Sequence, residues 1–481
     1  MGEESKAVFL GGGLSMQISI INKSDIVSAF RIDAECYQEK YISAQKKLLK
    51  IENTRLGDEV FIFSKGIFDI KSECYSTSGV PFVRIGDLKN FVIEQGNIIY
   101  IPETEHLKNY KTALKRGDII LSKTAYPAAS FVSLDECNTS QDTIAVKLNN
   151  NSKVNSEYLT VFLNSKYGFD QMRRWFTGNV QMHLNLIDSK NIVIPILDTI
   201  QGKVKSIFSS AIRLKTNSEI KLNQAHAILL HELNLTNWQP KHQLTFIKNY
   251  SDTEQAGRID AEYFQPKYEK IVKAIQSYSG GWDTLGTLVS VRKSVEVGSG
   301  EYLDEGIPFL RISNLSSFEL SEEKYISESL YQKLKKNQPE EGEILFSKDG
   351  TPGIAYYLHE KPHKMIPSGG ILRLQIRMDK INGEYLTLVL NSILTQEQIN
   401  RDVGGSIISH WRPDQVKETV IPILSEEKQT QIQQKVTESF NLRKQSKHLL
   451  ECAKKAVEMA IEQDEQAALN WLEDETGELR I

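Results

Sequence analysis

The chain has 481 residues, which is enough for two to four domains of ordinary size. Hydrophobic residues make up 40% and charged residues 25% of it, the composition of a globular protein, and no apolar run approaches the length of a membrane span. The net charge is −4, from 58 Lys and Arg against 62 Asp and Glu, so the overall charge gives no sign of a nucleic-acid binder. A protein with this net charge can still bind nucleic acid if its basic residues are gathered on one face.

Residues 1–30 are interpreted as an N-terminal extension, with Met16 as an alternative start. The segment lacks the basic-then-apolar pattern of an export signal, and Lys6 breaks the myristoylation motif. The cysteines are scattered without a C-x-x-C pair, so they predict neither a zinc site nor a disulfide framework, and they suit a reducing cytoplasm. We therefore expect a cytoplasmic protein with Cys36, Cys74, Cys137 and Cys452 as free thiols.

An internal repeat organises the sequence. "RIDAECYQEKY" from Arg31 returns 227 residues later as "RIDAEYFQPKY" from Arg258. The same offset joins "GVPFVRIGDL" to "GIPFLRISNL", "EYLTVFLNS" to "EYLTLVLNS", and the two copies of "VIPIL". "GDIILSKTAYPA" and "GEILFSKDGTPG" match at an offset of 225. The period is far too long for a solenoid, so each copy is a whole module.

We predict α+β modules at 31–198 and 258–424, each followed by a helical region, at 199–257 and 425–481. Runs such as "PFVRI", "DIILSK" and "TIAVKL", and their counterparts "PFLRI", "EILFSK" and "LRLQIR", have the composition of strands. The stretches of about twenty residues that begin at Glu157 and Glu384 are predicted to be helices. The charges of the "RIDAE" segments are expected to brace the start of each module.

The trailing segments carry apolar and small residues at alternating spacings of four and three. This pattern predicts two long helices that pack as an antiparallel coiled coil and separate the modules. The alternative is one amphipathic helix on each module. A helix of about 30 residues is roughly 45 Å long, which suits a spacer. The residues assigned to these subunit-docking helices are Val204, Phe208, Ala211, Leu222, Leu229, Leu449, Ala453 and Ala456.

No nucleotide-binding, hydrolase, kinase or metalloprotease motif occurs in the sequence, which gives no support for an active site. His183 and His410 occupy equivalent positions, but no partner acid or cysteine lies close in sequence. A structural or DNA-facing role is favoured for both. No catalytic residue, metal ligand or cofactor is expected.

Two loops in each module are candidates for DNA contacts. One follows the strand that ends at Lys123 or Lys348, and the other spans 173–185 or 400–412. Arginine reads guanine and Asn or Gln reads adenine, so the composition of the second loop suits base recognition. Ordinary hairpin turns are the alternative for the first loop, and a salt-bridged structural role is the alternative for Arg84 and Arg311. The candidate DNA-binding residues are Arg84, Lys123, Thr124, Arg173, Arg174, Asn179, Gln181, His183, Arg311, Asn314, Lys348, Thr351, Arg401, Ser406, His410 and Arg412.

The tandem "RIDAE" starts, the "G[VI]PF[VL]RI" strands, the "SK" turns and "VIPIL" before a long helix make the chain similar to the specificity subunit of type I restriction–modification systems. The resemblance covers about residues 20–475. It implies two target recognition domains that each read one half of a bipartite, asymmetric DNA site. It also implies helices that set the spacer and dock two methyltransferase subunits.

The resemblance further implies a non-catalytic subunit whose partners are double-stranded DNA, methyltransferase subunits and restriction subunits, with no membrane. S-adenosylmethionine, ATP and Mg²⁺ would belong to the partner subunits, which carry the adenine methyltransferase and ATP-dependent endonuclease activities. Two alternatives stay open at this point. One is a specificity subunit of a methyltransferase-only system, and the other is a duplicated protein-interaction scaffold that does not bind DNA.

Overall fold

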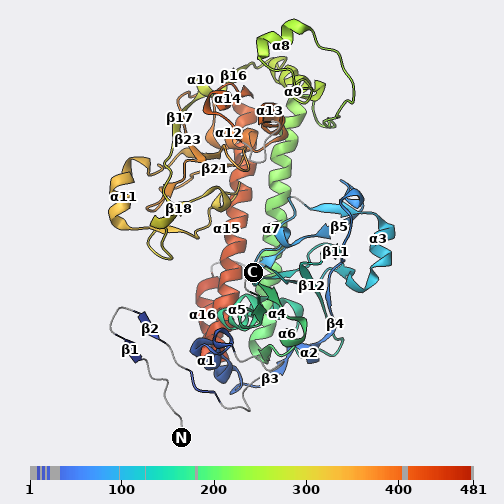
Figure 1. Ribbon diagram of the computed structural model, residues 1–481, viewed down its shortest axis with the longest axis vertical. Helices are drawn as coiled ribbons and strands as arrows, with labels where there is room; N and C mark the ends of the chain where they lie inside the picture. Colours follow the sequence, from blue (N-terminus) through green and yellow to red (C-terminus); the bar gives the residue numbers. More distant parts are fainter. Residues whose placement is uncertain are drawn as a thin grey trace. The chain divides into compact units, whose positions relative to one another are not determined.

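The computed structural model describes residues 8–10, 14–16, 19–21, 33–96, 98–124, 126–178, 182–403 and 410–477. The chain divides into two compact units (Figure 1). Unit 1 comprises residues 1–215 and 444–481, and unit 2 comprises residues 216–443. In the N-terminal extension, β1 (Val8–Leu10) and β2 (Leu14–Met16) pair as an antiparallel hairpin.

Unit 1 is built on a five-stranded sheet of order β4-β12-β9-β10-β6 and a four-stranded sheet of order β7-β5-β11-β8. The strands predicted from "PFVRI", "DIILSK" and "TIAVKL" are confirmed as β5, β9 and β12. Two short pairs, β13-β14 and β15-β3, complete the unit. The bounds are β3 (Asn53–Arg55), β4 (Val60–Lys65), β5 (Val80–Val83), β6 (Phe91–Val92), β7 (Ile99–Ile101), β8 (Leu114–Lys115), β9 (Ile119–Ser122), β10 (Ala129–Phe131), β11 (Glu136–Thr139), β12 (Thr143–Leu148), β13 (Phe176–Thr177), β14 (His183–Leu184) and β15 (Val193–Pro195).

The predicted single helix from Glu157 is wrong, because the structure has two helices there. α4 (Ser156–Asn164) ends before Ser165, whose hydroxyl accepts a hydrogen bond from Gly168 N (3.4 Å) and caps α5 (Lys166–Arg174). A Cβ on Gly168 would lie 2.2 Å from the carbonyl oxygen of Phe162, so this close turn requires glycine. The other helices that lie within unit 1 are α1 (Glu39–Leu48), α2 (Leu56–Glu59), α3 (Glu103–Lys108), α6 (Leu186–Ser189) and α16 (Glu465–Thr476).

Unit 2 repeats the plan with a four-stranded sheet, β17-β23-β20-β21, a three-stranded sheet, β19-β18-β22, and the pair β16-β24. Its strands are β16 (Trp282–Thr284), β17 (Val289–Lys293), β18 (Ile307–Leu310), β19 (Tyr325–Ile326), β20 (Glu343–Ser347), β21 (Ala355–Tyr357), β22 (Ile366–Pro367), β23 (Ile371–Ile376) and β24 (Val420–Pro422). Its shorter helices are α8 (Tyr250–Ala256), α9 (Pro266–Gln276), α10 (Leu285–Leu288), α11 (Glu328–Leu334), α12 (Gly383–Leu390), α13 (Ile393–Val403) and α14 (Pro413–Lys417). α12 and α13 show the same break in a predicted continuous helix.

Each unit contains part of two long helices, α7 (Asp198–Glu232) and α15 (Glu426–Glu462), seen side by side in Figure 1. Within unit 2 the pairing is antiparallel, because Ser439 Oγ donates to Ser218 O (2.8 Å) while Lys428 Nζ lies 3.0 Å from Glu232 Oε1. Within unit 1, Ser446 Oγ donates to Ala211 O (2.7 Å). The helical region predicted at 199–257 is interrupted, because α7 ends at Glu232 and helix returns only at α8.

The repeated "RIDAE" segment braces unit 2. The Arg258 guanidinium donates to both carboxylate oxygens of Asp260 (2.8 and 2.7 Å) and to Asp402 O (3.1 Å). In unit 1, Arg31 lies outside the described residues, and the Asp33 side chain accepts from Cys36 N (3.1 Å). The Arg258 contacts agree with the expected bracing role.

Candidate nucleic-acid interface

The two loops singled out in unit 1 meet in space. Lys123 directly follows β9, and its carbonyl oxygen accepts a hydrogen bond from Leu184 N (2.7 Å). Thr124 and His183 then form an isolated antiparallel bridge. The Nδ1 atom of His183 is buried and has no hydrogen-bond partner among the described residues. The bridge fixes residues 123–124 against the end of the 173–185 loop.

Unit 2 makes the same connection with different side chains. Lys348 O accepts from Trp411 N (2.8 Å), and Asp349 and His410 form the isolated bridge. His410 Nδ1 lies 2.9 Å from Asp349 Oδ1, and Lys348 Nζ contacts the other carboxylate oxygen. Asp349 therefore joins the two loops through its side chain, where unit 1 has Thr124.

The turns that begin at Arg84 and Arg311 lie beside these bridges. Ser140 N donates to Val83 O (3.0 Å), and Lys123 N donates to Asp142 O (2.9 Å), so one short turn connects the end of β5 to Lys123. In unit 2, Ser368 N donates to Leu310 O (2.8 Å) and Lys348 N to Gly370 O (2.9 Å). Three segments of each unit thus meet at one place.

Both arginines are half-exposed and engaged in local contacts. Arg84 N donates to Asp87 Oδ2 (2.8 Å), and Arg84 Nε lies 3.5 Å from the same oxygen. Arg311 N donates to Asn314 Oδ1 (3.0 Å), and Arg311 Nη2 donates to Glu323 (2.6 Å). The side chains retain 40% and 34% exposure, so an ion pair and a contact to an anionic ligand are compatible at these positions.

Several predicted contact residues are placed inside the protein. Arg174 is buried, donates to Cys36 O (2.8 Å) and Gln45 Oε1 (2.6 Å), and packs on the Tyr37 ring. Asn314 is buried as the cap of its turn. These two residues have structural roles, which sequence spacing alone did not reveal.

Other predicted residues lie at the surface or near it. Arg173, Thr351, His410 and Arg412 are exposed, and Lys123, Thr124, His183, Lys348 and Arg401 are partly exposed. Arg401 pairs with Asp402 (2.9 Å) and lies over the Tyr263 ring. Asn179, Gln181 and Ser406 lie outside the described residues. Sequence reasoning did not select Asp349, although its place between Lys348 and a turn glycine was a usable signal.

The residues assigned to subunit docking pack inside the units instead of facing a partner. Val204, Phe208 and Ala211 belong to the core of unit 1 with Leu449, Ala453 and Ala456. Leu229 belongs to the core of unit 2, and Leu222 packs against it. These apolar side chains pack against one another between the two long helices and are thereby removed from water. A docking partner would therefore contact only the outer faces of the helices.

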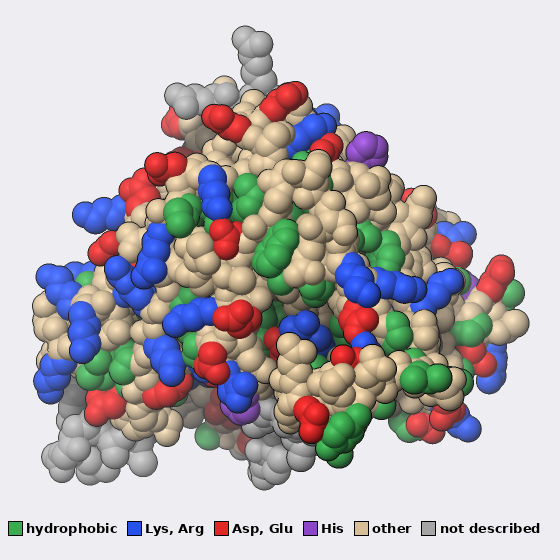
Figure 2. Space-filling view, turned by 90° about the horizontal axis from the view of Figure 1, so that it is seen from above, with side chains coloured by type: hydrophobic (Ala, Val, Ile, Leu, Met, Phe, Trp, Pro, Cys, Tyr) green, Lys and Arg blue, Asp and Glu red, His purple; other side chains and the backbone are tan. Residues whose placement is uncertain are grey.

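Charge is mixed on the face shown in Figure 2, where Lys and Arg side chains are interspersed with Asp and Glu. Among the described residues, no group of three or more His, Cys, Asp or Glu could hold a metal ion. None of the helices in the described ranges is long and apolar enough to cross a membrane.

The family comparison matches the duplicated architecture. The model of the type I restriction modification DNA specificity domain matches residues 50–225 and 291–451. The chain belongs to this family and carries two such domains in tandem, as in a specificity subunit of a type I restriction–modification system.

Three solved structures match the chain at low sequence identity. The S subunit of a type I restriction–modification system from M. genitalium is 13% identical, with a TM-score of 0.40, over 85% of this chain and 95% of that chain. The HsdS subunit from Thermoanaerobacter tengcongensis is 15% identical, with a TM-score of 0.28, over 86% of this chain and 97% of that chain. A chain from a structure on complex assembly and conformational transition of the type I R-M system is 16% identical, with a TM-score of 0.27, over 88% of this chain and 97% of that chain. No curated protein matches the chain.

Proposed function

We propose that each unit reads one half of a bipartite, asymmetric DNA site through the loops that meet at the Thr124–His183 and Asp349–His410 bridges. The observation that carries this proposal is the pair of equivalent bridges with unequal side chains. A common frame with divergent contact residues is what two different half-sites require. Two identical half-sites would not need the exchange of Thr124 for Asp349.

Phosphate contacts would give affinity and base contacts would give sequence choice. The exposed arginines Arg173 and Arg412 and the half-exposed Arg84 and Arg311 are assigned to phosphates or guanines. In unit 2, the Asp349 carboxylate can accept a hydrogen bond from the amino group of a base, or it can orient His410 and Lys348 toward the DNA. Arg174 and Asn314 are left out of the interface because they are buried.

In this proposal α7 and α15 act as the spacer, and their outer faces dock two methyltransferase subunits. Half-site centres on one face of the duplex would lie about one helical turn, roughly 34 Å, apart. Restriction subunits would complete the assembly. Methylation, which requires an adenine to be flipped from the helix, and ATP-driven cleavage would take place in the partners, with their S-adenosylmethionine, ATP and Mg²⁺.

The decisive experiment is footprinting of the protein with its modification partner on random DNA, followed by methylation mapping. We expect protection and methylation of one bipartite sequence. The absence of a protected sequence would contradict the proposal and favour the alternative of a protein-interaction scaffold that does not bind DNA. A bipartite methylated sequence without ATP-dependent cleavage, in a host that lacks a restriction subunit, would identify a methyltransferase-only system.

The assignment of one half-site to each unit is tested by module exchange. Replacing residues 31–198 with the matching module of another specificity subunit should change one half-site and leave the other unchanged. Residues inserted in α7 should change only the spacer. A change in both half-sites after the module exchange would contradict the assignment of one half-site to each unit.

A further inference from the structure

Four large apolar side chains are exposed close together in the sequence that leads into the module of unit 2. Leu244 and Ile247 lie between α7 and α8, Tyr250 is the first residue of α8, and Ile259 follows this helix (Figure 1). Leu244 is 94% and Ile247 is 95% exposed, so the rest of the chain does not cover them. Single exposed apolar residues are common, but several in one short segment mark an interaction surface.

The backbone of residues 244–248 is unpaired among the described residues. None of these five residues forms a backbone hydrogen bond there. The sequence "LTFI" from Leu244 is rich in residues that favour strands, yet it belongs to no strand of the structure. Unpaired N–H and C=O groups beside apolar side chains are a template for pairing with a strand of another protein.

This segment is held in place at both ends. On one side, Gln265 Oε1 accepts from Gln243 N (2.9 Å), and Gln265 Nε2 donates to Gln243 O (3.0 Å). On the other side, Lys248 Nζ forms an ion pair with Glu269. The residues between these two points are therefore positioned before any partner binds, which lowers the conformational entropy lost on binding.

The same segment precedes the module of unit 1. At the offset of 227 residues, "IINKSDIVSAFRIDAE" from Ile20 aligns with "IKNYSDTEQAGRIDAE" from Ile247. Ile20 is 78% exposed and lies between two partly exposed residues, as Ile247 does. Residues 22–32 lie outside the described residues. The repeat thus extends upstream of both modules and includes an exposed isoleucine in each unit.

This exposed isoleucine is the same in the two units, whereas the DNA-reading loops differ. A fully exposed side chain contributes little to the packing of its own unit, so packing does not account for its presence in both copies. Divergent loops suit two different half-sites, whereas a shared surface suits two copies of one partner. The proposed function contains such a partner, because two methyltransferase subunits join one copy of this chain.

We propose that residues 19–21 and 244–247 each bind one methyltransferase subunit by adding a strand to the edge of a sheet in that subunit, with Ile20 and Ile247 as apolar anchors. This inference rests on the proposed function and names a surface for one of its partners. Backbone hydrogen bonds supply affinity in this mode of binding, and a pocket for the isoleucine supplies selectivity. These contacts are additional to those on the outer faces of α7 and α15.

The number of bound subunits tests the assignment. The full chain is mixed with the methyltransferase subunit of the same host, and native mass spectrometry counts the subunits bound. The wild type should bind two. Ile20→Asp and Ile247→Asp should each weaken one of the two sites by roughly 30-fold or more and leave the other unchanged, and the double variant should lose both. Leu107→Asp, which changes an exposed leucine of α3, is the matched control and should bind two.

Hydrogen exchange tests whether the backbone pairs. The amides of residues 244–248 should exchange rapidly in the free chain and become protected in the complex. In Ile247→Asp this protection should be lost, while the site of unit 1 stays occupied. Circular dichroism and the Tm of each variant establish that it folds as the wild type does.

The inference is overturned if the double variant binds two methyltransferase subunits as the wild type does, or if residues 244–248 stay unprotected in the complex. It is also overturned if the two substitutions instead abolish DNA binding or a dimer of this chain, because the segments would then have a different occupant. Footprinting of the wild-type complex separates these results from a failure of the proposed function. Protection of a bipartite sequence together with unchanged docking in the double variant would overturn the docking inference alone.

Discussion

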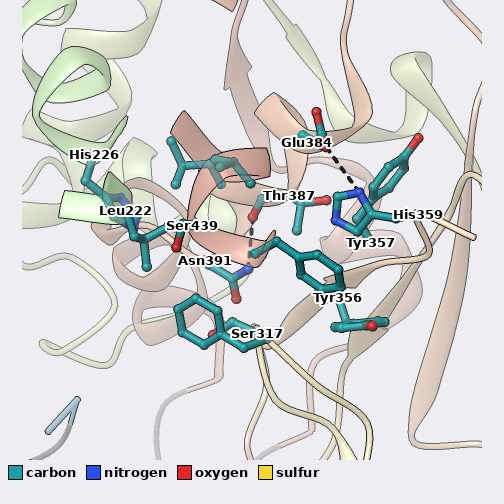
Figure 3. Close-up of a pocket in the computed structure, with 14 residues that line it drawn as sticks. Leu222, His226, Ser317, Tyr356, Tyr357, His359, Glu384, Thr387, Asn391 and Ser439 are labelled. Atoms are coloured by element: carbon teal, nitrogen blue, oxygen red, sulfur yellow. Dashed lines mark hydrogen bonds and ion pairs between the residues drawn. The ribbon is translucent and has the colours of Figure 1, made fainter. Parts of the chain in front are cut away.

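The two units share a frame but fill it differently. At the centre of the main sheet, unit 1 has Ala145 on β12, whereas unit 2 has Arg373 at the matching position of β23. Arg373 forms a buried bidentate pair with Glu343 (2.8 and 2.9 Å), both fully withdrawn from solvent. Near the long helices, unit 1 has the Phe131–Phe208 ring pair, whereas in unit 2 the ring of His359 packs against those of Tyr357 and Phe440 (Figure 3).

The comparison shows that a duplicated module tolerates large core changes when each is matched by its surroundings. The residue equivalent to Glu343 in unit 1 is Asp118, which is partly buried and lies 3.6 Å from Lys147. The acidic position persists, but its basic partner lies two residues further along the equivalent strand, as Lys147 on β12 instead of Arg373 on β23, and this pair is less deeply buried. The loops diverge in the same way, with Thr124 in one unit and Asp349 in the other.

The largest expected effect comes from breaking the buried ion pair. Glu343→Gln leaves the Arg373 charge buried without its carboxylate, and we expect the free energy of unfolding of unit 2 to fall by about 3–5 kcal/mol. Asp118→Asn in unit 1 is the matched control and should cost about 1 kcal/mol or less, because its lysine is closer to water. Urea titration followed by hydrogen exchange of peptides from each unit measures the loss of stability in both variants. Equal losses would contradict the expected difference between the two ion pairs.

The next effect concerns the aromatic pair. Phe208→Val removes one ring of the Phe131–Phe208 pair, and the lost ring contact and the new cavity should lower the stability of unit 1 by roughly 2–3 kcal/mol. Hydrogen exchange should show the loss in unit 1 and leave unit 2 protected. A variant as stable as the wild type would mean that the surrounding side chains collapse into the space.

The pH dependence of stability should also differ between the units. Burial lowers the pKa of His226 from 6.5 to about 4. Below pH 6.5 the unfolded chain therefore binds a proton that the folded imidazole does not, and stability is lost as the pH falls from about 6.5 to about 4. We expect unit 2 to lose about 2 kcal/mol over this range, less than the full shift implies because the ring is partly exposed.

His226→Leu is the control for this pH effect and should remove the loss from unit 2. Hydrogen exchange at several pH values reports the change by unit. An unchanged pH profile in His226→Leu would assign the loss to other groups.

The smallest expected effect, on DNA, is the most specific. Asp349→Asn should weaken binding by about 1–2 kcal/mol and relax base preference at one position of the half-site read by unit 2. Thr124→Ala should act on the other half-site alone, with a smaller loss. Binding to DNAs with single substitutions in each half-site, at fixed salt, measures both changes. If Asp349→Asn altered the base preference in both half-sites, this result would contradict the proposal that each unit recognises its own half-site.

Much of the frame could be predicted from the sequence because it depends on local patterns that occur twice. Alternating β-branched runs located β5, β9 and β12 and their counterparts, and the four-three spacing located α7 and α15. The break at Ser165 was missed because apolar residues continue on both sides of it, while the structure starts a new helix there with the Ser165 hydroxyl as its cap. Arg174 was assigned to DNA because composition does not show that its guanidinium points back to Cys36 O.

The repeat in the amino-acid sequence was sufficient to identify two copies of one module, each followed by a helical segment, because matches at a constant offset do not depend on how the chain packs. The three-dimensional structure was needed to see which loops meet, which arginines lie at the surface, and that apolar side chains of the chain itself fill the seam between the long helices. These properties depend on contacts between residues far apart in the chain, which are fixed by packing and solvent exclusion and leave no periodic signature in the sequence.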